Sequence, residues 1–264
     1  MKKLLSLLLC LGLMGLTAAC GGSGEPDPES VPAPEIVDSE TIRADPFAAY
    51  FDLSGLSQET LDGALQDVNM DTSTGEVSVQ FLQTLCDGQN LYVAFDINWP
   101  QGSDPAAEMI EANLITGDGS TYGGMVSSSQ TADLTGSYIV SFVGDFAPGT
   151  EASLYITVQG ENCVLAWTIE NTVSASTVNL EDSEGTVVGQ ASLTPFSLQF
   201  TIDDPYISGI AHGDTIQLLD ETGAPLPETW AISGDVSATF LEFFVPMELG
   251  TVKTLQVGPY TAHF

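Results

Sequence analysis

Positively charged side chains are almost missing from this sequence, which has 4 Lys and Arg against 36 Asp and Glu in 264 residues. A protein that binds DNA or RNA neutralises phosphates with Lys and Arg, so this composition argues against a nucleic-acid partner. Electrostatic attraction to anionic lipid headgroups is excluded for the same reason. Hydrophobic residues nevertheless make up 43% of the chain, which is enough to fill a folded core.

Histidine is also scarce, because the chain has 2 His residues, His212 and His263. Nucleophilic catalysis needs a base beside the nucleophile, and that base is most often a histidine. His212 falls in a predicted turn, His263 is the penultimate residue, and neither Gly-x-Ser-x-Gly nor His-Glu-x-x-His occurs. With 36 acids, chance carboxylate pairs do not indicate a glycosidase. We therefore predict that the protein is not an enzyme, and we assign no catalytic residue.

The first 20 residues have the layout of a secretory signal. Met-Lys-Lys precedes a run of Leu, Gly and Met that is too short for a membrane span of about 20 residues. Residues 17–22 then read Thr-Ala-Ala-Cys-Gly-Gly, which resembles the lipobox of bacterial lipoproteins, although Thr17 stands where Leu is usual. The resemblance implies that residues 1–19 are removed as a signal peptide and that Cys20 carries a lipid. The alternative is ordinary cleavage after Ala19 without a lipid.

Residues 20–45 are rich in Gly, Ser, Pro and acids and show no apolar periodicity. This composition predicts a disordered acidic tether that like-charge repulsion keeps extended. With a lipid on Cys20, we expect an extracytoplasmic protein anchored to the outer face of the cell membrane.

After the tether the pattern predicts one or two short helices and then many strands. Asp45-Pro46 opens the first helix, Ser57 caps the second, and apolar residues recur at helical spacing from Leu61 to Val68. From about residue 75 apolar residues alternate with polar ones, and Gly- and Asp-rich turns separate the runs. We predict a mainly β fold of two tandem antiparallel immunoglobulin-like sandwiches, at residues 46–171 (including the helices) and 172–264.

Two short motifs carry a second resemblance. Residues 85–93 read Leu-Cys-Asp-Gly-Gln-Asn-Leu-Tyr-Val, and residues 193–198 read Leu-Thr-Pro-Phe-Ser-Leu. Both resemble strand segments of an immunoglobulin-like ectodomain of unknown function in Gram-positive membrane proteins, including the outer parts of some membrane-bound anti-sigma factors. Those anti-sigma factors also carry a transmembrane helix and a cytoplasmic sigma-binding part. Neither is recognisable here, so we expect that this chain is not itself an anti-sigma factor.

Two cysteines, Cys86 and Cys163, fall in the predicted β region. Export permits a disulfide between them. However, Cys163 shares a strand face with Leu165, whereas alternation places Cys86 opposite Val79 unless a bulge intervenes. The alternatives are therefore one disulfide bridge or two separate thiols.

Calcium is the candidate cofactor that the acidic composition suggests, since carboxylates without cationic partners favour a hard divalent ion. Asp67, Asn69 and Asp71 place oxygen donors at alternate positions, as at the start of an EF-hand loop. The segment lacks the Gly at the sixth place, and Ser78 stands where a chelating Glu belongs. A solvated helix-to-strand connection without a metal is the alternative.

Trp99 and Tyr122 are the aromatic residues that we expect to be exposed, because one precedes a proline and the other lies in a Gly-rich segment. Exposed aromatic rings are suited to stack on a glycan. The sequence therefore supports two functions. The first is a non-enzymatic interaction module that senses or scaffolds the envelope through an unknown extracytoplasmic protein. The alternative is an extracellular glycan- or calcium-binding module.

Overall fold

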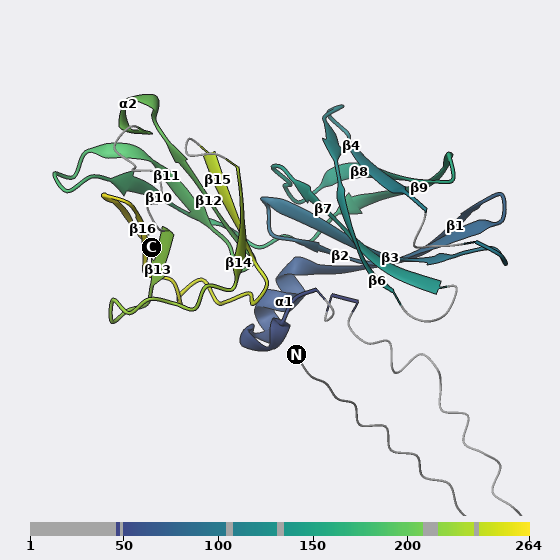
Figure 1. Ribbon diagram of the computed structural model, residues 1–264, viewed down its shortest axis with the longest axis horizontal. Helices are drawn as coiled ribbons and strands as arrows, with labels where there is room; N and C mark the ends of the chain where they lie inside the picture. Colours follow the sequence, from purple (N-terminus) through teal and green to yellow (C-terminus); the bar gives the residue numbers. More distant parts are fainter. Residues whose placement is uncertain (1–45, 48–49, 104–107, 131–134, 208–215, 235–237) are drawn as a thin grey trace, which may run out of the picture. The chain divides into compact units, whose positions relative to one another are not determined.

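The computed structural model describes residues 46–47, 50–103, 108–130, 135–207, 216–234 and 238–264. The predicted signal peptide, Cys20, the tether and His212 lie outside these residues. The described part is mainly β, and all of its strand pairs are antiparallel (Figure 1), which confirms the predicted fold class at this level. Among the described residues, no helix has both the length and the apolar composition that a membrane crossing requires.

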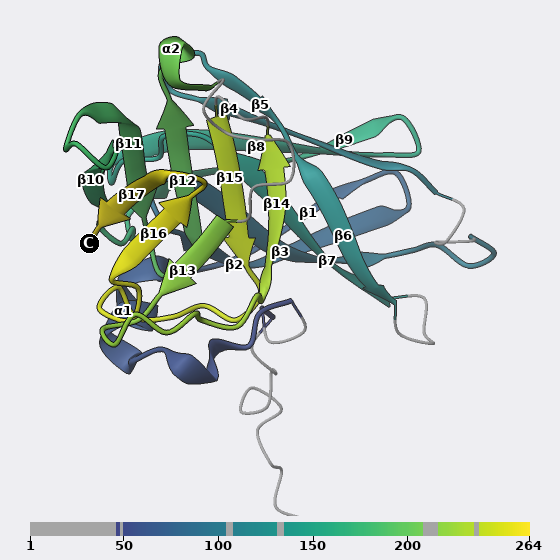
Figure 2. The same cartoon turned by 60° about the vertical axis from the view of Figure 1, so that its left-hand side comes forward.

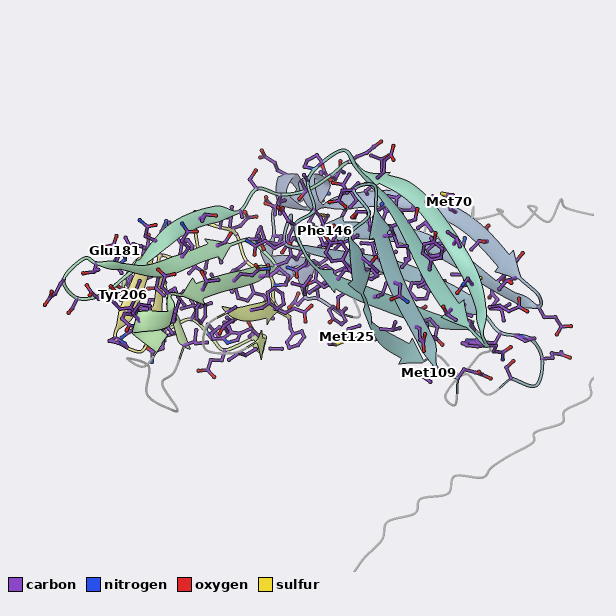
Figure 3. All side chains as sticks on the ribbon, turned by 90° about the horizontal axis from the view of Figure 1, so that it is seen from above. Met70, Met109, Met125, Phe146, Glu181 and Tyr206 are labelled. Atoms are coloured by element: carbon purple, nitrogen blue, oxygen red, sulfur yellow. The ribbon has the colours of Figure 1, made fainter. Side chains whose placement is uncertain are left out.

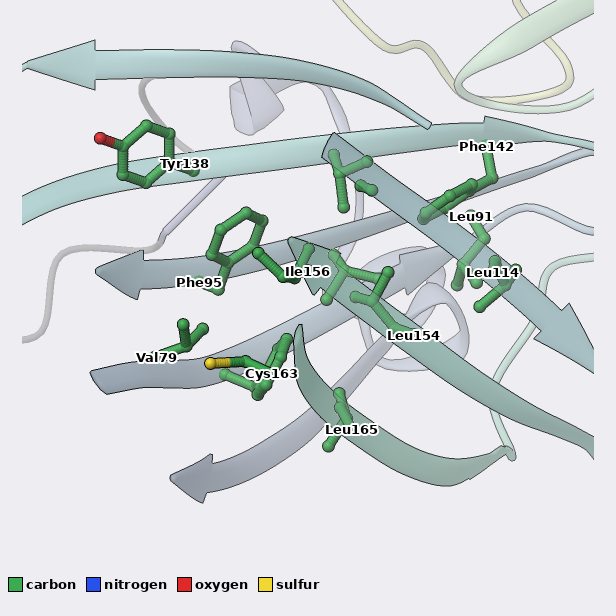
Figure 4. Close-up of a cluster of buried hydrophobic side chains, with 14 of the residues drawn as sticks. Val79, Leu91, Phe95, Leu114, Tyr138, Phe142, Leu154, Ile156, Cys163 and Leu165 are labelled. Atoms are coloured by element: carbon green, nitrogen blue, oxygen red, sulfur yellow. The ribbon is translucent and has the colours of Figure 1, made fainter. Parts of the chain in front are cut away.

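The first β part contains two sheets. The five-stranded sheet has the order β1 (Leu65–Thr74), β2 (Val77–Cys86), β3 (Asn90–Asn98), β7 (Thr135–Val143), β6 (Met125–Gln130). The four-stranded sheet has the order β5 (Thr121–Gly123), β4 (Ile110–Thr116), β8 (Thr150–Val158), β9 (Glu161–Ile169). Both sheets contribute buried side chains to one core (Figure 4), for example Phe95 from β3 and Leu154 from β8. The period-two pattern thus gives each sheet one apolar face, and the two faces pack together.

The second β part is one eight-stranded sheet that folds over its own core. Its order is β13 (Ile216–Leu219), β16 (Thr254–Val257), β17 (Tyr260–His263), β10 (Ser176–Glu181), β11 (Val187–Leu193), β12 (Ser197–Ile202), β15 (Ala238–Phe243), β14 (Trp230–Gly234). A single register pair, Glu181 with Thr261, joins β10 to β17. Strands from both sides of this join contribute to the same core, and Figure 2 shows β16 and β13 in front of β12. A short helix, α2 (Asp204–Ile207), follows β12.

The segment before β1 contains a turn, the 3-10 helix η1 (Leu53–Gly55) and the helix α1 (Gln58–Ala64). Ser57 precedes α1, and its hydroxyl accepts a hydrogen bond from the Thr60 backbone N–H at 3.3 Å. The helical spacing predicted through Val68 is wrong, because β1 begins at Leu65. Pairing with β2 over most of its length gives this segment interstrand hydrogen bonds that a lone helical turn cannot match.

A third apolar cluster joins the segment before β1 to both β parts, and we call it the junction cluster. Its buried members come from the first segment, from the outer face of the five-stranded sheet and from the turn before β12: Phe47, Phe51, Ala64, Leu85, Tyr92, Ala94, Ile139 and Phe196. The segment thus covers the end of a sheet face that would otherwise expose apolar side chains to water. This cluster positions the polar groups described next.

Candidate functional site at the junction of the two β parts

The turn between β2 and β3 holds a fully buried carboxylate, that of Asp87. Asp87 Oδ1 accepts hydrogen bonds from the backbone N–H groups of Gln89 at 2.9 Å and Asn90 at 2.6 Å. Gly88 adopts a φ of +83°, in the left-handed region that favours glycine. The Asp-Gly pair therefore builds a tight turn whose aspartate folds back onto its own backbone.

The other oxygen of Asp87 connects the two β parts. Asp87 Oδ2 accepts hydrogen bonds from the hydroxyls of Thr194 at 2.6 Å and Ser197 at 2.7 Å. The Asn90 side chain also donates to Ser197 Oγ at 2.9 Å. The two motifs singled out in the sequence, residues 85–93 and 193–198, are thus in direct contact. The partners of the Asp87 carboxylate are neutral donors, so fixed dipoles rather than a cation compensate its buried charge.

A second carboxylate at the junction, that of Glu242 on β15, lies among aromatic rings. The Tyr50 hydroxyl lies 3.4 Å from both Glu242 oxygens. The Tyr50 ring centroid is 6.3 Å from that of Tyr92 and 6.4 Å from that of Phe244. Tyr92 is buried, whereas Phe244 is 41% exposed, so this group of residues extends from the interior to the surface.

Burial dominates the protonation behaviour of this group. Loss of water raises the pKa of Glu242 above its ordinary value, although hydrogen bonds from Tyr92 and Tyr50 oppose the shift. Burial and the negative charge of Glu242 raise the pKa of Tyr50 to about 12, and the same causes hold the pKa of Tyr92 well above 10.0. Both phenols therefore remain protonated near neutral pH and act as hydrogen-bond donors toward Glu242.

The segment before β1 also contacts the second β part directly. The backbone N–H of Asp52 donates to the Phe244 carbonyl oxygen at 2.9 Å. Glu248 accepts hydrogen bonds from the Ser57 backbone N–H at 2.6 Å and from the Thr60 hydroxyl at 3.0 Å. The negative charge of Glu248 thus lies at the N-terminus of α1, where the helix dipole favours an anion.

Asp67, Asn69 and Asp71, the candidate calcium ligands, lie on strand β1 rather than in a helix-to-strand connection. Asp67 Oδ1 accepts a hydrogen bond from the Gln83 side chain at 2.9 Å, and Asn69 lies at an interruption of the β1–β2 register. An EF-hand loop curls around its ion over twelve residues, whereas this segment pairs with β2 on both sides of a bulge, in which Asn69 adopts a φ of +47°. In the part of the chain that the structure describes, no group of three or more His, Cys, Asp or Glu side chains is arranged to hold a metal ion.

The expectation that Trp99 is exposed is wrong. Trp99 is 5% exposed, and its ring N–H donates to the Tyr138 hydroxyl at 3.3 Å. It continues the alternation of β3, in phase with buried Phe95 and Ile97, so the strand pattern itself carried the signal. Tyr122 is partly buried, and its ring centroid lies 5.2 Å from that of Phe146, a buried core residue that is labelled in Figure 3.

Cys86 and Cys163 are both 1% exposed, and both are free thiols in the core of the first β part. The β2–β3 register skips Leu82, and this bulge places Cys86 on the same face as Val79. The bulge that the phase argument required is therefore present, yet the two thiols are not bonded. Burial raises the pKa of Cys86 to about 11 and also raises that of Cys163.

Several residues of the junction were not predicted as site residues, chief among them Glu242, Tyr50 and Thr194. A partial signal was available for Thr194, because it lies in a motif that the resemblance singled out. Glu242 is one of 36 acids, so nothing in the sequence distinguishes it. Its position opposite Tyr50 depends on contacts between residues 192 positions apart.

Comparison with known proteins yields a fold but no activity. No family model matches the chain, and no curated protein matches it. Among solved structures, it is similar to "The crystal structure of the conserved domain protein from Bacillus anthracis", with a TM-score of 0.53 and 13% sequence identity. The match covers 81% of this chain and 83% of that chain. Because each β part is less than half of the 264 residues, the similarity extends over both.

Proposed function

We propose that this protein is a lipid-anchored, extracytoplasmic interaction module that senses or scaffolds the cell envelope and has no enzymatic activity. In this proposal Cys20 carries the lipid, residues 20–45 are the tether, and the two β parts are immunoglobulin-like domains. The folded part would present a protein-binding surface at a fixed distance range from the membrane.

The observation that carries the proposal is the buried hydrogen-bond network of Asp87, Thr194 and Ser197. Independent domains on a flexible linker bury few polar groups between them, whereas a fully satisfied buried network favours one arrangement. A rigid tandem of β parts with an anionic surface is suited to bind another protein, because a pre-organised surface loses less conformational entropy on binding.

The proposal is tested by chemical crosslinking on intact cells, followed by affinity purification of the full chain and mass spectrometry. We expect one extracytoplasmic protein to be enriched in near-stoichiometric amount. Purification of the chain without a stable partner, repeated with crosslinkers of different length, would contradict the proposed function. A Cys20→Ser variant serves as the control for the anchor, because it should be released from the membrane fraction and lose the mass of the lipid.

A further inference from the structure

The junction exposes apolar surface beside a partly buried carboxylate. Phe244 is 41% exposed and the following Val245 is 37% exposed, at the end of the strand that carries Glu242. Tyr50 lies between Glu242 and Phe244, since its hydroxyl faces the Glu242 carboxylate and its ring packs against the ring of Phe244. Elsewhere in the fold, acids such as Asp182 and Asp220 lie in exposed turns.

The Glu242 carboxylate retains capacity to accept hydrogen bonds. Its contacts with the Tyr50 hydroxyl, at 3.4 Å, are longer than the 2.5–3.0 Å that hydroxyl donors prefer. Burial is the largest cause of its raised pKa, and the side chains that also act on this pKa, those of Tyr92, Tyr50 and Asp87, are not cations. The turn acids differ in this respect, because Asp182 accepts backbone N–H bonds at 2.8 and 2.9 Å.

Aromatic rings and a carboxylate together suit one chemical class of ligand. The face of an aromatic ring attracts a cation, and the attraction is stronger where water is partly excluded. A guanidinium group can stack on Phe or Tyr while it donates two hydrogen bonds to a carboxylate, and an ammonium group can make one such bond. The net negative charge of the chain, with 36 acids against 4 Lys and Arg, would also accelerate the approach of a positively charged partner.

We propose that Glu242, Tyr50 and Phe244 bind a cationic side chain, an arginine or a lysine, of a partner polypeptide. This inference rests on the proposed function and specifies the chemistry of the partner. The cation would form short, charge-assisted hydrogen bonds to Glu242 in place of the long contacts from Tyr50. The ring of Phe244 would cover the hydrocarbon stem of the partner's arginine or lysine.

The test is isothermal titration calorimetry of the full chain in detergent micelles with deca-arginine, deca-lysine and deca-citrulline at physiological salt. Citrulline keeps the shape of arginine without its charge. We expect Glu242→Gln and Phe244→Ala each to weaken deca-arginine binding about tenfold, and we expect no binding of deca-citrulline. Glu221→Gln is the matched control, because it removes the same charge from an exposed turn and should change the affinity less than twofold.

Equal weakening by Glu242→Gln and Glu221→Gln would overturn the inference, since it would show general attraction to an acidic surface. Absence of binding at physiological salt would overturn it as well. Thermal melts check that the variants fold, and Tyr50→Phe adds a conservative change that should preserve or strengthen binding by freeing Glu242. A partner that crosslinks equally to the wild type and to Glu242→Gln refutes this site but leaves the proposed function standing.

Discussion

Replacement of Asp87 by alanine should reveal how strongly the junction joins the two β parts. The change removes two hydrogen bonds across the junction, from Thr194 at 2.6 Å and from Ser197 at 2.7 Å, together with the bonds from the Gln89 and Asn90 backbone N–H groups within the turn. A bond to a charged group contributes about 1.5–3 kcal/mol, so the two together contribute about 3–6 kcal/mol. Part of this is recovered, because the two hydroxyls lie 2.9 Å apart and can bond each other. With the lost turn bonds included, we expect the free energy of unfolding to fall by about 4 kcal/mol or more.

Thermal and urea unfolding measure this loss. For a folded part of this size, about 4 kcal/mol corresponds to a fall in Tm of roughly 10 °C. The two β parts should also separate into two unfolding transitions, because the network that couples them is gone. The matched control is Asp96→Ala, which removes one hydrogen bond, from Ser137 at 2.7 Å, within the first β part. We expect the control to lose about 1.5 kcal/mol, the low end of the range for a charged group, because Asp96 is only partly buried. A similar loss for both variants would refute the argument that Asp87 holds the junction.

Three further predictions concern the second β part, the pH dependence and the thiols. Gly189→Ala should destabilise the fold by about 3 kcal/mol or more in urea unfolding, because a Cβ there would collide with the backbone of the paired strand β12. Gly250→Ala, with open space around its Cβ, should change stability by about 0.5 kcal/mol or less, and equal losses would contradict the steric argument. Since the pKa of Glu242 is raised above 4.5 in the folded state, the folded state binds the proton more tightly. The unfolding free energy should therefore rise as the pH falls from neutral through that pKa, and this group should add nothing more below about pH 4.5. A Glu242→Gln variant with the same dependence of unfolding free energy on pH would show that Glu242 is not its cause. Cys86 and Cys163 should resist alkylation at pH 8 in the native protein and react fully in urea without a reductant, whereas a mass shift on reduction would reveal a disulfide.

The strand pattern was readable from the sequence because it depends on local alternation. Leu154, Ile156 and Val158 alternate with partly exposed residues, and the structure buries all three. The same reasoning failed where an element depended on its neighbours. Leu65 to Val68 continue a helical spacing, yet pairing with β2 places them in a strand. The bulge at Leu82 was equally hidden, because the bulged residue is an ordinary apolar one.

The sequence by itself determined the acidic composition, the alternating apolar faces and the two motifs at residues 85–93 and 193–198. Only the tertiary structure decided that these motifs contact each other, with Asp87 between them and Glu242 beside Tyr50. The physical reason is the range of the interactions. Alternation acts between residues two positions apart, whereas the junction joins residues more than 100 positions apart. Such contacts form only after packing of the apolar faces has brought distant segments together.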